Sequence, residues 1–367
     1  GYKPATVIDF DIPKKYGIKQ TIADTLGIGG IMRGLRTIPI LLDIAKDIIE
    51  VCPKALWLQY VNPMCSNMIA INKKFPEIKS IGLCHSVQGT AEMLAKDLNE
   101  DIGNINFTCA GINHMAFFLK FEKKQNGLNI DLYPKLKILA DEIISDKKIS
   151  SRSKNIHYES NKILHEKVRY EILRRFGYFV TESSEHFAEY VPWFIKNNRD
   201  DIIKKYKIPI DEYIDRCEHH AKTWQELEKD ITPLKNEPLK LSNEYASYII
   251  DAVTNNKSIT VNANLMNNNL INNLPSNCCV EVPCLINSDG YNPQKVGNLP
   301  EQLAALMRTN INVQILTAEA ATTNKKEYIY HAAMLDPLSA SSLSIDEIYS
   351  MTDELIVAHK DYLPKYN

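Results

Sequence analysis

The chain has 367 residues, of which 44% are hydrophobic and 24% charged, a composition typical of globular proteins. It is therefore neither disordered nor collagen-like, and it is long enough for a large core and two lobes. Its 43 Lys and Arg residues against 45 Asp and Glu residues give a net charge of -2, so it lacks the basic surplus that holds nucleic acid or an anionic membrane. We expect a small molecule as the partner, with no nucleic acid and no membrane.

Targeting segments are not evident in the sequence. No apolar run reaches the roughly 20 residues of a membrane helix. Residues 1–15 also lack the basic segment followed by an apolar segment that is typical of a signal peptide. The eight cysteines are irregularly spaced, unlike those of a small disulfide-rich module. We therefore predict a cytoplasmic protein with reduced thiols, in which any specialised Cys is a metal ligand or a nucleophile.

The first part of the chain is predicted to alternate helices and strands. Residues 37–51 have apolar side chains at helical spacing, and residues 55–63 form a nearly continuous apolar run, as a buried strand would. The same patterns predict a helix over 64–75, a strand over 79–85 and a helix over 86–98. This alternation predicts an α/β lobe with a mostly parallel sheet.

Polar side chains stand where the predicted strands of this lobe end. Asn62 ends the first strand, and Cys84 and His85 end the second. Ligands of such sheets bind at the carboxyl ends of the strands. We therefore expect these three residues near a ligand.

The second part of the chain is predicted to mix helices and strands. Residues 147–170 are polar and indicate a surface loop between lobes. A charged helical region at 196–232 is followed by strand-like segments at 258–265 and 278–286 and by helices at 302–323 and 344–360. We therefore divide the chain into an α/β lobe, 1–120, and a mixed α+β lobe, 121–367.

A glycine-rich turn, Gly27–Gly30, precedes a helical segment. A dinucleotide-binding fingerprint would need another glycine at position 32, which is Met32. A tight turn at a helix entry is therefore favoured over a backbone cradle for an anionic or hydroxylated ligand. Arg33 and Arg36 would suit such a ligand, because a guanidinium group offers a fork of donors.

The adjacent residues Cys84 and His85 have three interpretations. They can be a thiolate nucleophile with its base, a pair of metal ligands, or a buried thiol beside a hydrogen-bonded imidazole, and from these residues alone the last is favoured. Another histidine, His114, follows a second apolar strand. Cys84 and His114 together would suit a borderline divalent ion that polarises a substrate.

The densest cluster of titratable residues lies at 180–192. A helix would place Glu182, His186 and Tyr190 on one face, at i, i+4 and i+8. Interleaved apolar residues argue against a purely solvated face, so a site and surface charge patterning are about equally supported.

Other Cys and His residues are predicted to be structural or exposed. Cys278, Cys279 and Cys284 lack CxxC spacing and lie in an apolar strand, which favours core packing. His219 and His220 lie on a charged helix and are expected to be exposed.

Motifs spread in order over nearly the whole chain resemble the NAD- and manganese-dependent family 4 glycoside hydrolases, most closely their α-galactosidase (melibiase) branch. They are GIGGIMRGLR (27–36), WLQYVNP (57–63), GLCHSVQG (82–89), GINHMAFFL (111–119), GYFVTESSEHFAEYVPWF (177–194) and LAALMRTNINVQ (303–314). The resemblance implies an enzyme that cleaves α-galactosides by redox-assisted elimination with NAD and Mn²⁺ as cofactors. A degenerate sugar-binding or interaction protein, and a related α-glucosidase or α-galacturonidase, are the alternatives.

The implied reaction starts with oxidation of the sugar C3 hydroxyl by NAD, which acidifies the C2 proton. A base removes that proton, the glycosidic oxygen leaves with acid help, water adds, and the ketone is reduced again. A divalent ion at the C2 and C3 oxygens would stabilise the developing charge.

The resemblance also assigns site residues. They are Cys84 and His114 for the metal, His85 for the leaving-group acid, Arg36, Asn62 and Asn113 for the substrate, and Tyr190 or His186 for the C2 base. A tyrosine starts near a pKa of ~10 and a histidine near ~6.5, so His186 would need less tuning, whereas family precedent slightly favours Tyr190.

Members of this family begin with a strand, a Gly-rich turn and a helix that hold the NAD pyrophosphate, and the sequence as given lacks that segment. The resemblance therefore implies a truncated Rossmann-like parallel lobe over 1–120, a catalytic and substrate lobe over 121–367, and unknown NAD-binding residues. An impaired activity and a homo-oligomeric state are further expectations.

Overall fold

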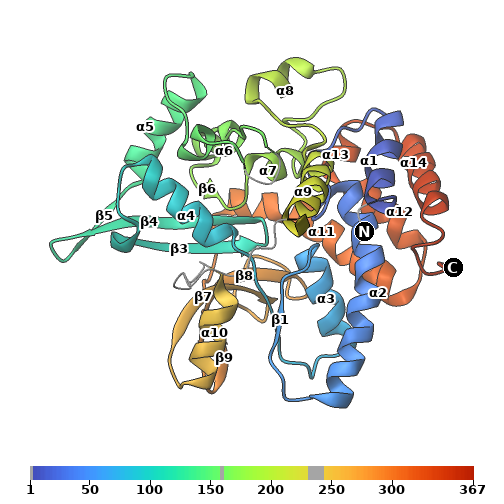
Figure 1. The fold of residues 1–367 in the computed structure, drawn as a ribbon, viewed down its shortest axis with the longest axis horizontal. Coiled ribbons are helices and arrows are strands. Elements are labelled where there is room, and N and C mark those ends of the chain that lie inside the picture. Colours follow the sequence, from blue (N-terminus) through green and yellow to red (C-terminus); the bar gives the residue numbers. More distant parts are fainter. Residues whose placement is uncertain (1–2, 158–160, 230–243) are drawn as a thin grey trace.

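A computed structural model describes residues 3–157, 161–229 and 244–367 of the chain. All named strands belong to one sheet, with helices on both of its faces (Figure 1). The strands are β1 (Trp57–Gln59), β2 (Ser80–Gly82), β3 (Ile105–Ile112), β4 (Met115–Gln125), β5 (Leu128–Asp131), β6 (Phe179–Val180), β7 (Ile259–Met266), β8 (Cys279–Asn287) and β9 (Gly290–Pro293).

The helices of the described residues confirm the predicted α/β class. They are α1 (Ala5–Lys15), α2 (Gly27–Val51), α3 (Met64–Lys74), α4 (Ser86–Asp97), α5 (Tyr133–Ile144), α6 (Lys167–Phe176), α7 (Ser184–Glu189), α8 (Asp200–Tyr206), α9 (Glu212–Lys229), α10 (Tyr245–Thr254), α11 (Glu301–Thr323), α12 (Glu327–Leu335), α13 (Pro337–Ala340) and α14 (Ile345–Ala358).

The sheet is mixed. Within the first predicted lobe, β1 and β2 pair in parallel as predicted, whereas β3 and β4 pair antiparallel. The strand order of the sheet is β1-β2-β7-β8-β3-β4-β5, with β6 beside β4 and β9 beside β8. Among these named strands only β1 and β2 pair in parallel. The reason is the short β3–β4 connection, since a tight turn permits only antiparallel pairing.

Strands from both predicted lobes share this sheet. The boundary predicted at residue 120 falls within β4, and β7 and β8 lie between β2 and β3. Asn264 of β7 faces both Gly82 of β2 and Glu281 of β8, and Glu281 in turn faces Gly111 of β3. The strand ends that deliver Cys84 and His114 are therefore fixed relative to each other through two intervening strands.

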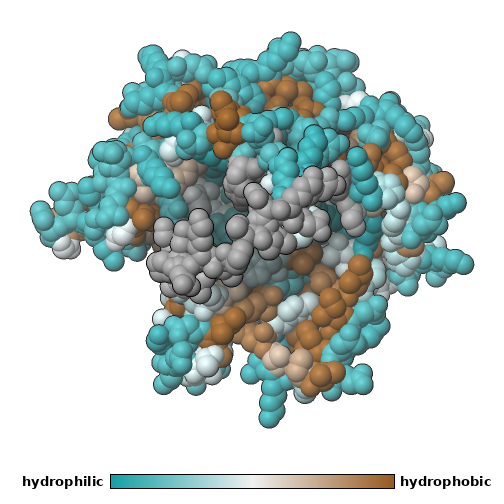
Figure 2. Space-filling model, in the orientation of Figure 1, coloured by the Kyte–Doolittle hydropathy of each residue, from teal (hydrophilic) through white to brown (hydrophobic). Residues whose placement is uncertain are grey.

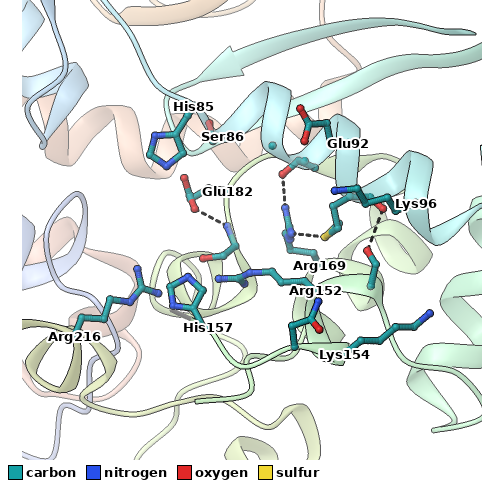
Figure 3. A pocket seen from close by; sticks show the side chains of 16 residues that line it. His85, Ser86, Glu92, Lys96, Arg152, Lys154, His157, Arg169, Glu182 and Arg216 are labelled. Atoms are coloured by element: carbon teal, nitrogen blue, oxygen red, sulfur yellow. Dashed lines mark hydrogen bonds between the residues drawn. The ribbon is translucent and has the colours of Figure 1, made fainter. Parts of the chain in front are cut away.

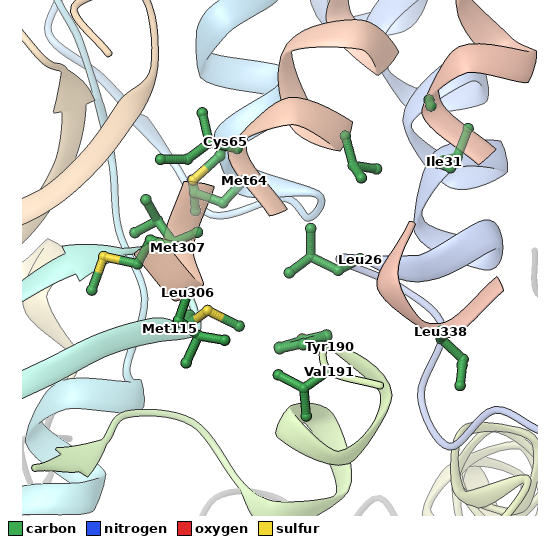
Figure 4. Packing of buried hydrophobic residues seen from close by; sticks show 14 of the residues in the cluster. Leu26, Ile31, Met64, Cys65, Met115, Tyr190, Val191, Leu306, Met307 and Leu338 are labelled. Atoms are coloured by element: carbon green, nitrogen blue, oxygen red, sulfur yellow. The ribbon is translucent and has the colours of Figure 1, made fainter. Parts of the chain in front are cut away.

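The main core lies where α2, α3, α7 and α11 meet the sheet. Figure 4 shows Leu26, Met115, Tyr190 and Val191 around one part of it, all of them buried. The glycine-rich start of α2 packs closely here. A Cβ on Gly30 would lie 2.6 Å from the backbone of Thr25, so the turn serves a close approach of the chain to itself.

The surface combines charged residues with a few exposed apolar ones. Figure 2 shows hydrophobic residues gathered in the lower part of this face, around α2 and α3. On α2, Ile40, Ile44 and Val51 are exposed. None of the helices in the described residues has both the length and the apolarity that crossing a membrane requires.

Arg36 lies on α2 within a buried ion network that joins three helical segments. Its guanidinium donates to Asp9 of α1 at 3.0 Å, and Nε2 of His359, which follows α14, lies 2.7 Å from the same carboxylate oxygen. Asp9 and His359 are almost completely buried. Arg36 thus neutralises a buried carboxylate, and it lines neither of the cavities near Cys84.

We expect Arg36→Ala to destabilise the protein by about 3 kcal/mol, because removing one partner of a buried pair leaves the other charge uncompensated. Chemical denaturation measures this effect. Lys46→Ala is the control, since Lys46 pairs with Asp43 in solvent and its loss costs roughly 0–1 kcal/mol. Equal stability of both variants would show that Arg36 is free for a ligand.

Candidate active site

A cavity of about 420 Å³ opens at the ends of β1 and β2. Asn62 reaches it from the segment after β1, and Cys84 and His85 reach it from the segment after β2. The expectation that polar residues at these strand ends share one site therefore agrees with the geometry.

Three potential metal ligands meet in this cavity. The Nε2 atom of His114 lies 3.4 Å from Sγ of Cys84 and 3.4 Å from Oε2 of Glu182. The donor atoms of all three residues lie within 4.8 Å of one another. Atoms that each lie just over 2 Å from a shared ion are separated by about 3 to 4 Å, so this thiol, imidazole and carboxylate set fits a divalent transition metal.

The backbone presents two of these ligands in an unusual conformation. His114 occupies the turn between β3 and β4 with φ +63°, and Glu182 precedes α7 with φ +59°. Left-handed backbone is uncommon for residues other than glycine and often occurs at functional sites. Here it turns both side chains toward Cys84.

Tyr190 orients His114 from within the core. Its hydroxyl lies 3.1 Å from Nδ1 of His114, which leaves Nε2 to face Cys84 and Glu182. Partners of this kind fix the ring and the tautomer of a metal-binding histidine. Tyr190 is fully buried, and burial raises its pKa well above the usual value, with Asp24 acting in the same direction.

His186 lines the cavity beside the three ligands. Its Nδ1 lies 2.8 Å from the hydroxyl of Ser183 and 3.6 Å from Oε1 of Glu182, and its Nε2 lies 3.8 Å from Asp24. The prediction that one helix aligns Glu182, His186 and Tyr190 is wrong, because α7 covers only Ser184–Glu189. The three side chains nevertheless gather around His114, since the segment before α7 folds back toward it.

Burial and neighbouring charges set the protonation of the site. Burial raises the pKa of Cys84 above its usual range, and the nearby carboxylates Glu182 and Glu281 act in the same direction. Burial would also raise the pKa of Glu182, but His114 and His186 outweigh it and lower that pKa well below its usual range. Burial lowers the pKa of His186. A bound cation would favour the thiolate of Cys84, because metal coordination deprotonates a thiol.

A loop before α2 adds a further charged group to the cavity. It presents Asp24, which lies 4.0 Å from Arg33, and Arg33 donates to the hydroxyl of Tyr213 at 3.1 Å. The carboxylate of Glu189 accepts backbone N–H bonds from Thr21, Ile22 and Ala23 of this loop. Glu189 is thus a buried anchor for the loop that holds Asp24.

The site residues predicted from the sequence separate into three groups, and one of them is Arg36 alone, which pairs with Asp9 away from the cavity. Those in or beside the cavity are Cys84, His114, His85, Asn62 and His186. Asn113 and Tyr190 are fully buried next to it without lining it, and neither polar atom of the Asn113 side chain has a partner among the described residues. Cys278, Cys279 and Cys284 are buried as core residues, whereas the exposed His220 lines the rim of the cavity.

Sequence reasoning did not assign Glu182 to the metal, nor Asp24 and Glu189 to the site. Glu182 was expected beside His186 and Tyr190 in a titratable cluster, but no spacing rule links it to Cys84 or His114. Arg33 was considered as a ligand-binding residue, and the structure places it 4.0 Å from Asp24. No motif or apolar spacing in the sequence pointed to Asp24, since it lies on an irregular loop.

Solved glycosidases share this fold. A glucosidase of Bacillus subtilis matches with a TM-score of 0.84 at 26% identity, over 95% of this chain and 79% of that one. A 6-phospho-α-glucosidase from gut microorganisms, solved with NAD and Mn²⁺, matches with a TM-score of 0.77 at 18% identity, over 100% of this chain and 80% of that one.

Sequence comparison identifies the family. Residues 1–100 match the family 4 glycosyl hydrolase model, and residues 109–339 match the family 4 glycosyl hydrolase C-terminal domain. An α-galactosidase of Bacillus subtilis (strain 168) is 49% identical over 366 residues, covering 100% of this chain and 80% of the relative. An α-galactosidase of Rhizobium meliloti is 34% identical, covering 98% of this chain and 71% of that relative. The chain belongs to the family 4 glycosyl hydrolases.

We expect Cys84→Ser, His114→Ala and Glu182→Gln each to weaken Mn²⁺ binding about tenfold or more, since second-shell changes alone commonly cost that much. Isothermal titration calorimetry measures the affinity. Cys217→Ser is the matched control, because Cys217 lines the same cavity outside the ligand set. Unchanged affinity in all three variants would exclude this metal site.

Proposed function

We propose that the protein is an α-galactosidase that hydrolyses α-galactosides such as melibiose, with Mn²⁺ and NAD as cofactors. The convergence of Cys84, His114 and Glu182 in one cavity is the observation that supports it most strongly. The 49% identity to a Bacillus subtilis α-galactosidase favours the galactoside. Family membership favours NAD-dependent chemistry.

The cofactors divide the chemistry with the residues of the chain. A bound divalent ion supplies a Lewis acid for the sugar oxygens, and NAD supplies an acceptor and later a donor of hydride. Asn62 and Asp24, on opposite elements of the cavity, present hydrogen-bonding groups to the sugar hydroxyls. A ring held in this way would direct its C2 atom toward His186 and its C1 atom toward His85, two of the four histidines that line the cavity.

His186 is the better placed of the two candidates for the C2 base. It lines the cavity, whereas Tyr190 lies among buried apolar residues (Figure 4), and its hydroxyl is 3.1 Å from Nδ1 of His114. Ser183 and Asp24 lie on either side of the imidazole and can hold it in one orientation. They can also accept a proton from the imidazole or return a proton to it. Tyr190 then acts through His114 as a positioning residue.

His85 is placed to protonate the leaving oxygen. It follows Cys84 directly, its side chain is 72% exposed, and its Nδ1 lies 3.7 Å from Glu244. An exposed imidazole can regain a proton from solvent after each turnover. It lines the cavity with the three ligands and also the neighbouring cavity, so a glycosidic bond beside it would have a sugar on each side.

We also propose a cytoplasmic homo-oligomer. All eight cysteines are unpaired, which supports a reducing compartment. The exposed apolar side chains of α2 support a contact between subunits.

We expect the protein to release nitrophenol from 4-nitrophenyl α-galactoside in the presence of NAD, Mn²⁺ and a reductant, at the impaired rate expected from the sequence, and to lose this activity on chelation. His85→Ala should slow melibiose hydrolysis about 100-fold and nitrophenyl galactoside hydrolysis far less, because nitrophenolate leaves without an acid. Parallel assays with the α-glucoside and the α-galacturonide test the sugar. Hydrolysis of only one of these would contradict the galactosidase assignment.

The base is identified by exchange of the C2 hydrogen of the substrate with solvent deuterium, followed by NMR. We expect His186→Ala to lose exchange. Tyr190→Phe should retain exchange while binding Mn²⁺ more weakly, because it no longer holds His114. The opposite pattern, with exchange lost only in Tyr190→Phe at normal Mn²⁺ affinity, would restore Tyr190 as the base.

A further inference from the structure

A second cavity, of about 560 Å³, adjoins the one that holds the metal ligands. His85, Glu182 and Arg216 line both cavities, so the two meet at these residues. The walls of the second cavity come from α4, from the segment around residues 151–157 and from α6. The proposed chemistry places the leaving group on this side of His85, but it assigns no role to the charged residues of the cavity.

The charged side chains of this cavity are mostly cationic. Its lining contains five Lys and Arg residues but only two carboxylates, Glu92 and Glu182. The cationic residues are Lys96, Arg152, Lys154, Arg169 and Arg216. Glu182 belongs to the metal-ligand set, and Glu92 lies on α4 with Lys96. With both carboxylates counted, the lining still has more cationic than anionic side chains.

The arginines direct their positive charge toward the cavity because the carboxylates that pair with them lie behind them in the protein. Arg152 pairs with Glu166 and Glu185, and Arg216 pairs with Glu185 and Glu212. These three carboxylates are fully buried and are not part of the cavity lining. The cavity therefore faces the guanidinium ends of ion pairs whose carboxylates lie farther inside the protein, and the nearer positive groups favour an anion.

Two lysines stand at the far end from the catalytic groups. Figure 3 shows His85 and Glu182 on one side of the cavity and Lys96 and Lys154 on the other. Both lysines are exposed, and among the described residues neither has an ion-pair partner. They are free to bind an anionic group that enters from the direction of His85.

We propose that this cavity is the leaving-group subsite and that it selects α-galactosides whose leaving group has a carboxylate or phosphate. The proposal rests on the proposed function, because it places the glycosidic bond beside His85 with the galactose in the metal-binding cavity. The aglycone then extends past Arg152 toward Lys96 and Lys154. Carboxylate and phosphate share the oxyanion chemistry that lysine and arginine recognise.

The test compares matched substrates that differ by one anionic group. One pair is 4-nitrophenyl and 3-carboxy-4-nitrophenyl α-galactoside, and the other is α-galactosylglycerol and its phosphate. We expect KM to be about fivefold lower for the charged member of each pair, the scale of two exposed ion pairs, and this preference to weaken in high salt. A preference for only one pair would identify which oxyanion the cavity accepts.

The decisive variant is Lys96→Gln combined with Lys154→Gln. It should abolish the preference, so that KM for the charged member of each pair equals KM for the neutral member. Lys137→Gln combined with Lys360→Gln removes the same charge from exposed sites away from this cavity and should keep the preference. Equal KM values for charged and neutral substrates in the unaltered protein, or a preference that survives in Lys96→Gln/Lys154→Gln, would overturn the proposal.

The failure of the proposed function is distinguishable from the failure of the subsite. If neither member of a pair is hydrolysed, the galactosidase assignment fails. The cavity is then tested by calorimetry with 3-carboxy-4-nitrophenol and with inorganic phosphate. Binding that is lost in Lys96→Gln/Lys154→Gln and kept in the control supports an anion site, and binding that is absent or equal in both variants refutes it.

Discussion

The structure depends on bringing a thiol, an imidazole and a carboxylate together in a buried space. Cys84, His114 and Glu182 have their donor atoms within 4.8 Å of one another, although their positions in the chain span almost 100 residues. Glu182 is ionised without a metal, whereas burial and the neighbouring carboxylates keep Cys84 as a neutral thiol. A thiolate beside that carboxylate in a low dielectric would be strongly repelled, and a cation between them offsets the repulsion, so the ligand set favours a divalent metal.

The fold supplies the rigidity that such a site requires. β2 and β3 do not pair directly, and their separation is fixed by β7 and β8 between them. The turn after β3 presents His114, and the core residue Tyr190 holds its ring. Glu189, one residue earlier, anchors the loop that presents Asp24. Neighbouring residues of one segment thus stabilise two walls of the cavity.

In the proposed reaction, the two cavities bind different parts of the substrate. The ligand set lies in one cavity, the cationic walls lie in the other, and His85 stands where they join. An acid at that position can act only on the bond between the two bound groups. The chemistry at the sugar and the selection of the leaving group are therefore separate properties, and each depends on different residues.

Much of the site could be predicted from local patterns, because residues at strand ends approach a common edge. Asn62, Cys84 and His85 were expected there for that reason, and they line the cavity. The chemistry of Cys84 and His114 suggested that they could share a metal ion, but their assignment as its ligands needed the family resemblance, because 30 residues separate them along the chain. Glu182 and Asp24 lie in irregular segments, so the spacing of apolar residues could not predict where their side chains lie.

The arrangement of the sheet and the role of Arg36 show where local patterns fail. Apolar runs indicate strands but not their direction, so the hairpin at His114 could not be distinguished from a parallel crossover. Arg36 matched a substrate-contacting motif, yet its partner Asp9 lies 27 residues away on another helix. Only the packed structure shows that this charge is already compensated.

The most direct test of the central claim is anomalous X-ray diffraction from crystals soaked in Mn²⁺ and galactose, recorded at the manganese edge. The account predicts one dominant peak within coordination distance of Sγ of Cys84, Nε2 of His114 and a carboxylate oxygen of Glu182, with the sugar in the same cavity. A peak elsewhere, or none at saturating Mn²⁺, would contradict it.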